Sequence, residues 1–258
     1  MPPSGAAPIV ALRDVGKAFA AVVALDGFDF AVRQGEFVSL LGPSGCGKST
    51  ALRLIAGLAA PTSGAIEWSD GNRPAPGGLG FVFQEPTLMP WRSVSGNVRL
   101  PLKLLGLDRA AAAERVAAAL AGVGLAEFAR AYPRELSGGM KMRVSIARAL
   151  ATAPQLLLMD EPFAALDEIT RFRLANDLLR LWQTLGKTVV FVTHSVFESV
   201  FLSNRIVVMT PRPGRVFAEI PIAAPYPREE SFRTSPEYAD SCRRVSQALA
   251  AAMRGDGA

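Results

Sequence analysis

The stretch GPSGCGKST, from Gly42 to Thr50, decides the fold of this chain. It matches the pattern G-x-x-x-x-G-K-[ST], in which glycines let successive backbone N–H groups face an anion. An apolar run, EFVSLL (36–41), comes directly before it and predicts a buried strand, and a helix is expected to begin near Lys48. A strand, a glycine loop and a helix in this order predict a phosphate-binding loop that holds a nucleoside triphosphate.

The residues of this loop have distinct predicted roles. Lys48 would reach the β- and γ-phosphates, and Ser49 would offer its hydroxyl to Mg²⁺. Cys46 is expected to fit a tight loop rather than to perform redox chemistry. Nucleotide contacts are predicted for Gly42, Ser44, Gly45, Cys46, Gly47, Lys48, Ser49 and Thr50.

A second apolar run, LLLMDEP (156–162), ends in two adjacent carboxylates. Asp160, at the end of the predicted strand, is suited to hold Mg²⁺. Glu161 faces the opposite way and is suited to orient and deprotonate a water in line with the γ-phosphate. The alternative is a charged boundary between a strand and a turn, but the phosphate loop favours the catalytic interpretation.

Gln84 closes GFVFQ, and His194, the one histidine, follows TVVFVT (188–193). Ligands of open α/β sheets gather at the carboxyl ends of strands. We therefore predict catalytic roles for Gln84 and His194, with Gln84 as a ligand of Mg²⁺ or of the attacking water. A structural hydrogen bond is the alternative for His194.

Short apolar runs separated by helices predict a parallel sheet that is covered on both faces. Between about Pro86 and Pro154 the strand signals vanish and alanine-rich segments predict helices. Residues 211–236 hold many prolines and predict an irregular wrap before a final short helix. The predicted strands are 9–19, 28–33, 36–41, 65–68, 80–83, 155–160, 188–193 and 205–210. An amphipathic helix is predicted over 168–185, with Phe172, Ala175, Leu178, Leu179, Trp182 and Leu185 on its apolar face.

The net charge of +5 is explained by solubility or by attraction to an anionic membrane surface. Nucleic acid is not predicted as a partner, because the basic residues are dispersed rather than clustered with aromatics. Two cysteines predict no disulfide framework and a reducing compartment. Neither a signal peptide nor a membrane-spanning run is expected, which predicts a soluble, cytoplasmic chain when it is alone.

Six segments stand in the order and spacing of ABC transporter ATP-binding subunits, which the chain resembles over roughly residues 9–220. They are GPSGCGKST, Gln84, LSGGM (136–140), LLLMDEP, FAALD (163–167) and His194. The resemblance implies an α/β fold: a RecA-like P-loop ATPase core (9–84 and 155–235), with an antiparallel β subdomain and an inserted helical subdomain (85–154). Residues 236–258 would form a short C-terminal helix and tail.

The resemblance also implies a second role for glycines in this chain. In such proteins two subunits pair head to tail, so Ser137, Gly138 and Gly139 would bind the ATP held by the partner's phosphate loop. Asp167 would cross the same interface. Phe19 would stack on adenine, with a plain core phenylalanine as the alternative. The family more often has Gln where this chain has Met140, a change that leaves the glycines intact.

A narrower resemblance is to the nitrate, sulfonate and taurine importers, which LMPWRSVSGNVRLPL (88–102), HSVFESVFLSNRIVV (194–208) and TPRPGRV (210–216) carry. It implies ATP and Mg²⁺ as cofactors and, as partners, a second ATP-binding subunit, most simply an identical copy, together with transmembrane permease subunits. A periplasmic or extracellular solute-binding protein would act indirectly. The chain would then lie peripherally on the cytoplasmic face of the membrane. Residues 85–99 would be the coupling surface, where Met89 and Trp91 suit a groove for a partner's short helix or are simple core residues.

Two other functions fit part of this pattern. A soluble ABC ATPase acting on nucleic acid or ribosomes is the first, but such proteins usually carry two cassettes or a long coiled-coil insertion. A P-loop kinase or nucleotide switch is the second, but it would have no use for LSGGM (136–140). The sequence therefore favours a role as the motor subunit of an importer. The solute would be selected by a separate binding protein and permease.

Overall fold

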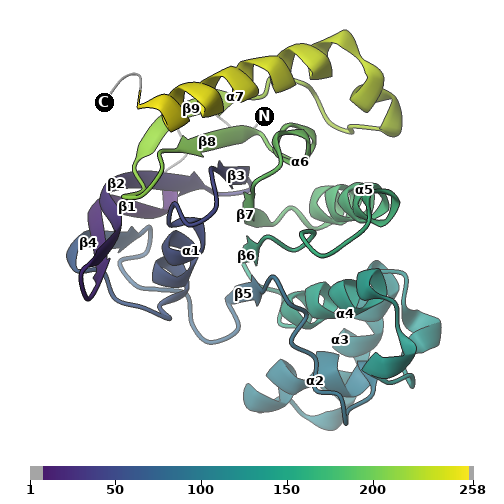
Figure 1. Cartoon of the computed structure of the whole chain (residues 1–258). Helices are drawn as coiled ribbons and strands as arrows, with labels where there is room; N and C mark the ends of the chain where they lie inside the picture. The colour runs from purple at the N-terminus through teal and green to yellow at the C-terminus, as the bar shows by residue number, and fades with distance from the viewer. Residues whose placement is uncertain (1–7, 256–258) are drawn as a thin grey trace. The chain divides into compact units, whose positions relative to one another are not determined.

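The computed structural model describes residues 8–255, which divide into two compact units (Figure 1). The first unit contains residues 8–73 and 188–255, and the second contains residues 74–187. Within the described residues, no helix has both the length and the apolar character that crossing a bilayer requires.

An antiparallel sheet opens the first unit. It consists of β1 (Pro8–Phe19), β2 (Val22–Arg33) and β4 (Ser63–Trp68), in the order β2-β1-β4. β2 begins six residues before the predicted strand (28–33), because Val22 and Val23 pair with the end of β1. The antiparallel β subdomain that the family resemblance implied is therefore confirmed.

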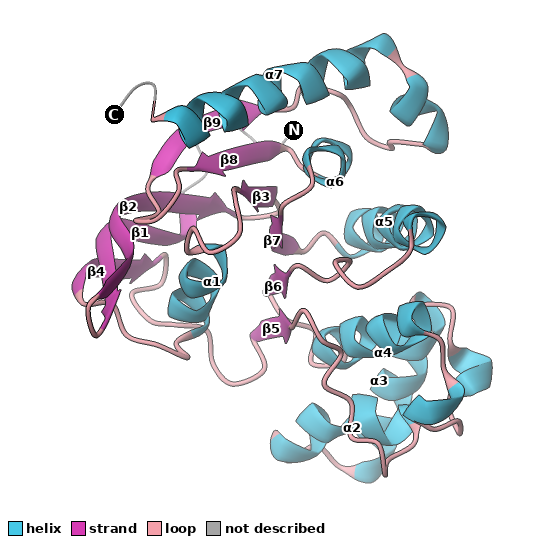
Figure 2. Cartoon of the chain, in the orientation of Figure 1, coloured by secondary structure: helices cyan, strands magenta, loops and turns pink. Residues whose placement is uncertain are grey.

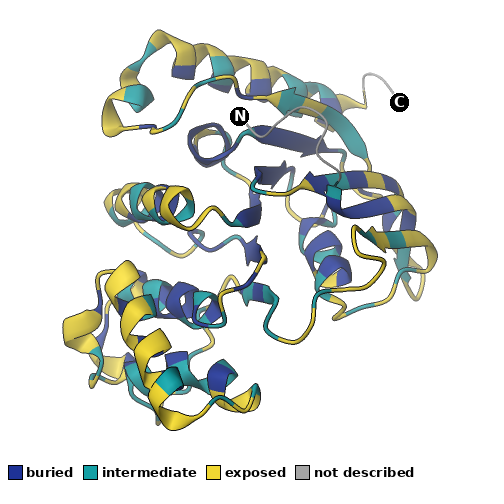
Figure 3. Cartoon of the chain, turned by 180° about the vertical axis from the view of Figure 1, so that it is seen from behind, coloured by how far each residue is buried: buried dark blue, intermediate teal, exposed yellow. Residues whose placement is uncertain are grey.

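The central strands of the first unit are buried along their whole length (Figure 3). β3 (Phe37–Leu41) lies parallel to both β7 (Thr188–Thr193) and β8 (Arg205–Met209). Their continuous runs of buried apolar residues are typical of a parallel sheet that is covered on both faces. The prediction of buried parallel strands at these positions is confirmed.

One strand of this sheet was not predicted. β9 (Val216–Pro221) pairs antiparallel with β8, inside the segment that was expected to be irregular. Its half-exposed pattern and its final proline are typical of an edge strand, where a residue without an N–H is tolerated. The high proline content of residues 211–236 hid this strand from the sequence analysis.

The helices of the first unit are α1 (Lys48–Ala56), α6 (Val196–Leu202), the short 3-10 helix η3 (Glu230–Thr234) and α7 (Pro236–Arg254). α7 begins where it was predicted, but with 19 residues it is not the short helix that was expected. Ser235 caps its first turn, and Gly255 ends it in a left-handed conformation.

Helices dominate the second unit (Figure 2). A parallel pair of strands, β5 (Leu79–Val82) and β6 (Leu156–Asp160), brackets α2 (Val94–Leu104), α3 (Arg109–Gly122) and α4 (Gly138–Leu150). Two 3-10 turns, η1 (Ala126–Phe128) and η2 (Pro133–Glu135), join α3 to α4. The helical character predicted between Pro86 and Pro154 is confirmed.

α5 (Glu168–Leu185) follows β6 within the second unit and matches the predicted amphipathic helix. Its buried positions are Leu174, Ala175, Leu178 and Leu179. Phe172 and Leu185 were predicted on the apolar face but are 37% and 42% exposed. The buried face is therefore narrower than the periodicity suggested.

Candidate functional site

The phosphate loop (Gly42–Thr50) leaves the end of β3 and enters α1 in the first unit. Gly45 and Gly47 have φ of +77° and +102°, a region that other residues rarely adopt. A Cβ on Gly47 would lie 2.7 Å from Leu25 Cδ2 and 2.8 Å from the carbonyl oxygen of Ala24. Gly45 is therefore required by its conformation, and Gly47 by both its conformation and the lack of space for a side chain.

Lys48 is the cation of this loop and is only 4% exposed. Its Nζ donates to the carbonyl oxygens of Gly42 at 2.8 Å and Pro43 at 3.0 Å. α1 begins at Lys48 without a side-chain cap and has no acidic residue in its first turn. A helix N-terminus of this kind, next to a held ammonium group, is suited to bind phosphate.

A second turn packs against the phosphate loop, and the sequence analysis did not assign it to the site. This proline turn (Thr210–Val216) places Gly214 so close that a Cβ would lie 2.0 Å from the Cys46 carbonyl oxygen. The Arg212 guanidinium donates to the Gly45 carbonyl at 3.2 Å. In the sequence, TPRPGRV (210–216) indicated only a resemblance to a group of importers. Its glycine, Gly214, was nevertheless a signal that the backbone of this turn packs closely against another segment.

Phe19 ends β1 in the first unit and is 48% exposed, so it is not a core residue. The ammonium of Lys17 lies 4.9 Å from the centre of its ring. An exposed ring that already attracts a cation offers a flat face to a further aromatic group. The predicted contact with adenine stays a prediction that this exposure allows.

His194 follows the last residue of β7 and is exposed. Hydrogen bonds fix the turn that carries it: the Thr193 hydroxyl donates to Glu198 Oε2 at 2.5 Å and accepts from the Ser195 N–H at 3.0 Å. Arg228, only 5% exposed, donates to three carbonyl groups at the end of α6, the helix that follows His194. Arg228 thereby holds the C-terminal end of α6.

One end of a strand pair in the second unit carries three predicted site residues. They are Gln84, which follows β5, and Asp160 and Glu161, at the end of β6. β5 and β6 are parallel and pair Val82 with Met159, so the residues that follow both strands emerge together. Asp160 is 7% exposed. Glu161 has φ of +43°, a strained conformation for a residue with a side chain. Such outliers concentrate at functional sites, which agrees with the predicted base.

The signature segment (Leu136–Met140) opens α4. The Ser137 side chain caps the helix by accepting from the Met140 N–H at 3.3 Å. Ser137 and Gly138 are exposed, whereas Gly139 is buried. A Cβ on Gly139 would lie 2.6 Å from Thr170 Cγ2 at the start of α5, so this glycine is needed for packing as well.

Asp167 lies close to this contact within the same unit. It caps α5, and its Oδ1 accepts from the Thr170 N–H at 2.9 Å. Backbone hydrogen bonds, that of Thr170 first, lower the pKa of the exposed Asp167 carboxyl. Thr170 thus joins the cap of α5 to the second glycine of the signature segment.

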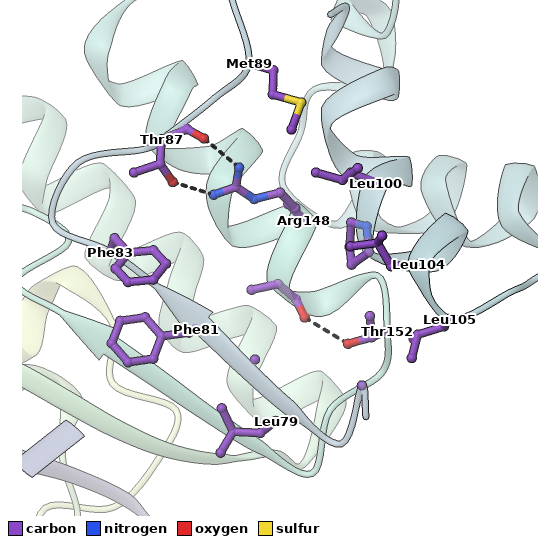
Figure 4. Close-up of a pocket in the computed structure, with 14 residues that line it drawn as sticks. Leu79, Phe81, Phe83, Thr87, Met89, Leu100, Leu104, Leu105, Arg148 and Thr152 are labelled. Atoms are coloured by element: carbon purple, nitrogen blue, oxygen red, sulfur yellow. Dashed lines mark hydrogen bonds between the residues drawn. The ribbon is translucent and has the colours of Figure 1, made fainter. Parts of the chain in front are cut away.

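The second unit also contains an apolar groove of about 470 Å³ (Figure 4). Met89 lines it, as predicted, but Trp91 does not, and Trp91 is 73% exposed rather than in a core. The full lining of this β5–α2 groove is Gly77, Leu79, Gly80, Phe81, Phe83, Thr87, Met89, Leu100, Pro101, Leu104, Leu105, Arg148, Ala149 and Thr152.

The chain is similar to known proteins in both sequence and structure. The taurine import ATP-binding protein TauB of Rhizobium johnstonii is 46% identical over 225 residues, which cover 85% of this chain and 86% of that protein. The nitrate import ATP-binding protein NrtD of Synechocystis is 44% identical over 236 residues, 88% of each chain. Among solved structures, a dimeric ATP-binding cassette in a post-hydrolysis state with ADP and Pi is 34% identical, with a TM-score of 0.72 over 83% of this chain and 99% of that one. A family model described as ABC transporter matches residues 25–164. The chain belongs to the ABC transporter family, as one of its ATP-binding and ATP-hydrolysing subunits.

Proposed function

We propose that the chain is the motor subunit of an importer for a small solute of the nitrate, sulfonate or taurine kind. The observation that carries the proposal is the coverage of 85–88% of the chain by relatives named as import ATP-binding proteins. The rival, a soluble ATPase acting on nucleic acid or ribosomes, is not favoured by these relatives. The chain would lie peripherally on the cytoplasmic face of the membrane.

We assign ATP to the phosphate loop, with Phe19 against adenine and Lys48 on the β- and γ-phosphates. The oxygen donors of Ser49, Gln84 and Asp160 suit Mg²⁺, which prefers few protein ligands beside nucleotide phosphates and water. When bound, Mg²⁺ would neutralise charge on those phosphates. Glu161 would take a proton from the attacking water, and His194 would orient the γ-phosphate.

The signature segment is assigned to the ATP of a second copy of this chain. Ser137 and Gly138 are exposed at the start of α4 and offer a hydroxyl and helix N–H groups without a lysine. Such a terminus attracts phosphate but binds it weakly by itself, at about 0.3–2 kcal/mol. Closure of the dimer would therefore depend on ATP already held by the partner's phosphate loop, with Asp167 at the same interface.

The β5–α2 groove is assigned to the permease. Its lining is apolar except for Thr87, Arg148 and Thr152, and it includes residues on both sides of Gln84 in the sequence, Phe83 before it and Thr87 after it. Helix-in-groove recognition uses apolar anchors at helical spacing. The partner would therefore be a short amphipathic helix in a cytoplasmic loop of the permease, which would carry the motion of the dimer into the membrane.

Glu161→Gln tests the proposed cycle. Since Gln keeps the shape but cannot accept the proton, hydrolysis is expected to slow by about 10²–10⁴-fold while ATP binding persists. The variant is expected to collect as an ATP-bound dimer, which light scattering with and without MgATP would detect. Near-normal turnover would remove Glu161 from the role of base.

The import function needs a separate measurement. The wild-type chain, co-expressed with its candidate permease, should co-purify with that permease. In vesicles, its ATP turnover should rise when the cognate solute-binding protein and solute are added. A chain that hydrolyses ATP but never binds a permease would contradict the assignment to an importer.

A further inference from the structure

Arg148 bonds to the loop that follows Gln84. It lies near the end of α4, and its Nη1 donates to the Thr87 carbonyl at 2.8 Å (Figure 4). Its Nη2 donates to the Pro86 carbonyl at 2.9 Å and to Thr87 Oγ1 at 2.9 Å. Burial lowers the pKa of Arg148, but a guanidinium stays charged at neutral pH, so all these bonds are charge-assisted.

The backbone that Arg148 holds is strained. Thr87 has φ of +47°, a left-handed conformation that is a genuine outlier for a β-branched residue. Such conformations persist only where the surroundings determine them. Here two of the three bonds go to Thr87 itself, so the guanidinium stabilises this turn.

The turn forms part of the β5–α2 groove and is attached to both of its helical walls. Thr87, Met89 and Arg148 all line the groove. Asn97 of α2 is fully buried; its Oδ1 accepts from the Met89 N–H at 2.7 Å, and its Nδ2 donates to the Met89 carbonyl at 3.2 Å. One anchor of the loop is therefore on α2, and the other is on α4, the helix that begins with the signature segment.

We propose that Arg148 is a positioning residue that couples the β5–α2 groove to the signature segment. Arg148 and the signature segment belong to one helix. Ser137 caps the beginning of α4, and Arg148, near the end of α4, bonds to the turn that lines the groove. A displacement of α4 when its N-terminus engages ATP is passed to Pro86 and Thr87 through the guanidinium. This inference rests on the proposed function, because it takes the groove as the permease site.

Trp91 provides a probe beside the turn. Phe replaces Trp68 and Trp182, so that Trp91 is the one tryptophan, in a chain that also carries Glu161→Gln. MgATP is expected to change Trp91 emission as the dimer closes. Arg148→Met should still dimerise but show less than a fifth of that change, and Arg148→Lys should be intermediate, because an ammonium retains part of the bonding.

Two further variants separate coupling from general loosening of α4. Arg143 on the same helix pairs with Asp177 of α5 at 2.6 Å and does not touch the turn, so Arg143→Met should keep the full emission change. Thr87→Gly combined with Arg148→Met should not recover it, because glycine adopts φ near +47° without help but supplies no bond between the turn and α4. Recovery of the emission change in this double variant would show that Arg148 only holds the turn in its conformation, and would overturn the proposal.

The outcomes are distinct. A full emission change in Arg148→Met, or no ATP-dependent change in a parent that does dimerise, overturns the proposal. A parent that never dimerises with MgATP instead contradicts the proposed function. The hold of Arg148 on the turn is then judged from Trp91 anisotropy without nucleotide: a fall in Arg148→Met but not in Arg143→Met supports the proposed positioning role, and equal values reject it.

Discussion

The two glycine-rich helix starts of this chain are built differently. α1 begins without a side-chain cap, after glycines with left-handed backbones and beside the buried ammonium of Lys48. α4 begins with its own cap, because Ser137 accepts from Met140, and the signature segment (Leu136–Met140) contains no lysine, although Lys141 follows it. The first start leaves its N–H groups to a ligand and supplies the charge within the loop, whereas the signature segment itself supplies only neutral donors. This difference agrees with the proposed roles, in which the first site would bind ATP alone and the second would need ATP delivered by a partner.

The largest expected effects come from substituting one residue at each of the two helix starts. Lys48→Ala is expected to weaken ATP binding by about 100-fold, since a charge-assisted bond contributes up to about 3 kcal/mol and about 1.4 kcal/mol is tenfold. Ser137→Arg should leave ATP binding by the monomer unchanged and abolish the ATP-dependent dimer. Calorimetric titration with ATP and light scattering measure the two effects. Equal losses of ATP affinity in both variants would show that the two starts do not differ in this way.

A smaller effect is expected inside the signature segment. Gly139→Ala should destabilise the chain by about 1–2 kcal/mol, because its Cβ would lie 2.6 Å from Thr170 Cγ2 and such overpacking costs about 1–3 kcal/mol. Gly138→Ala is the matched control, since the nearest atom to its Cβ would be 3.7 Å away. Thr170→Ser removes Cγ2 and should restore stability to Gly139→Ala in urea unfolding. If Thr170→Ser does not restore stability, the destabilisation by Gly139→Ala does not come from the contact with Thr170 Cγ2.

The sequence predicted what depends on local pattern. The phosphate loop follows from glycine spacing between a buried strand and a helix, and β3, β7 and β8 follow from continuous apolar runs. β9 was missed because its edge position tolerates proline and half-exposed residues.

Contacts between distant residues were also missed. Arg148 meets Thr87, 61 positions away, and Arg212 meets Gly45, 167 positions away. A single arginine in a sequence carries no sign of the carbonyl group that it will find. The residues assigned to the nucleotide could therefore be proposed from the sequence, whereas the arginines that bond to the phosphate loop and to the turn at Thr87 could not.

The smallest predicted effect concerns the cap of α5 beside the signature segment. Asp167→Ala removes the acceptor of the Thr170 N–H, so the melting temperature at neutral pH should fall by a few degrees at most. The folded-state pKa of Asp167 lies below its ordinary value of 3.8. Its stabilisation is therefore present above about pH 4–5 and is lost as the pH falls through the lowered pKa, where the two melting temperatures should converge.

A matched variant separates this cap from the interface role. Asp108 caps α3 through the N–H groups of Ala110 and Ala111, and the same kind of bonds lowers the pKa of its carboxyl. Asp108→Ala should therefore cause a similar small fall in melting temperature. Only Asp167→Ala should also weaken the ATP-dependent dimer, because only Asp167 lies beside the start of α4. If both variants dimerise like the wild type, Asp167 is a helix cap and nothing more.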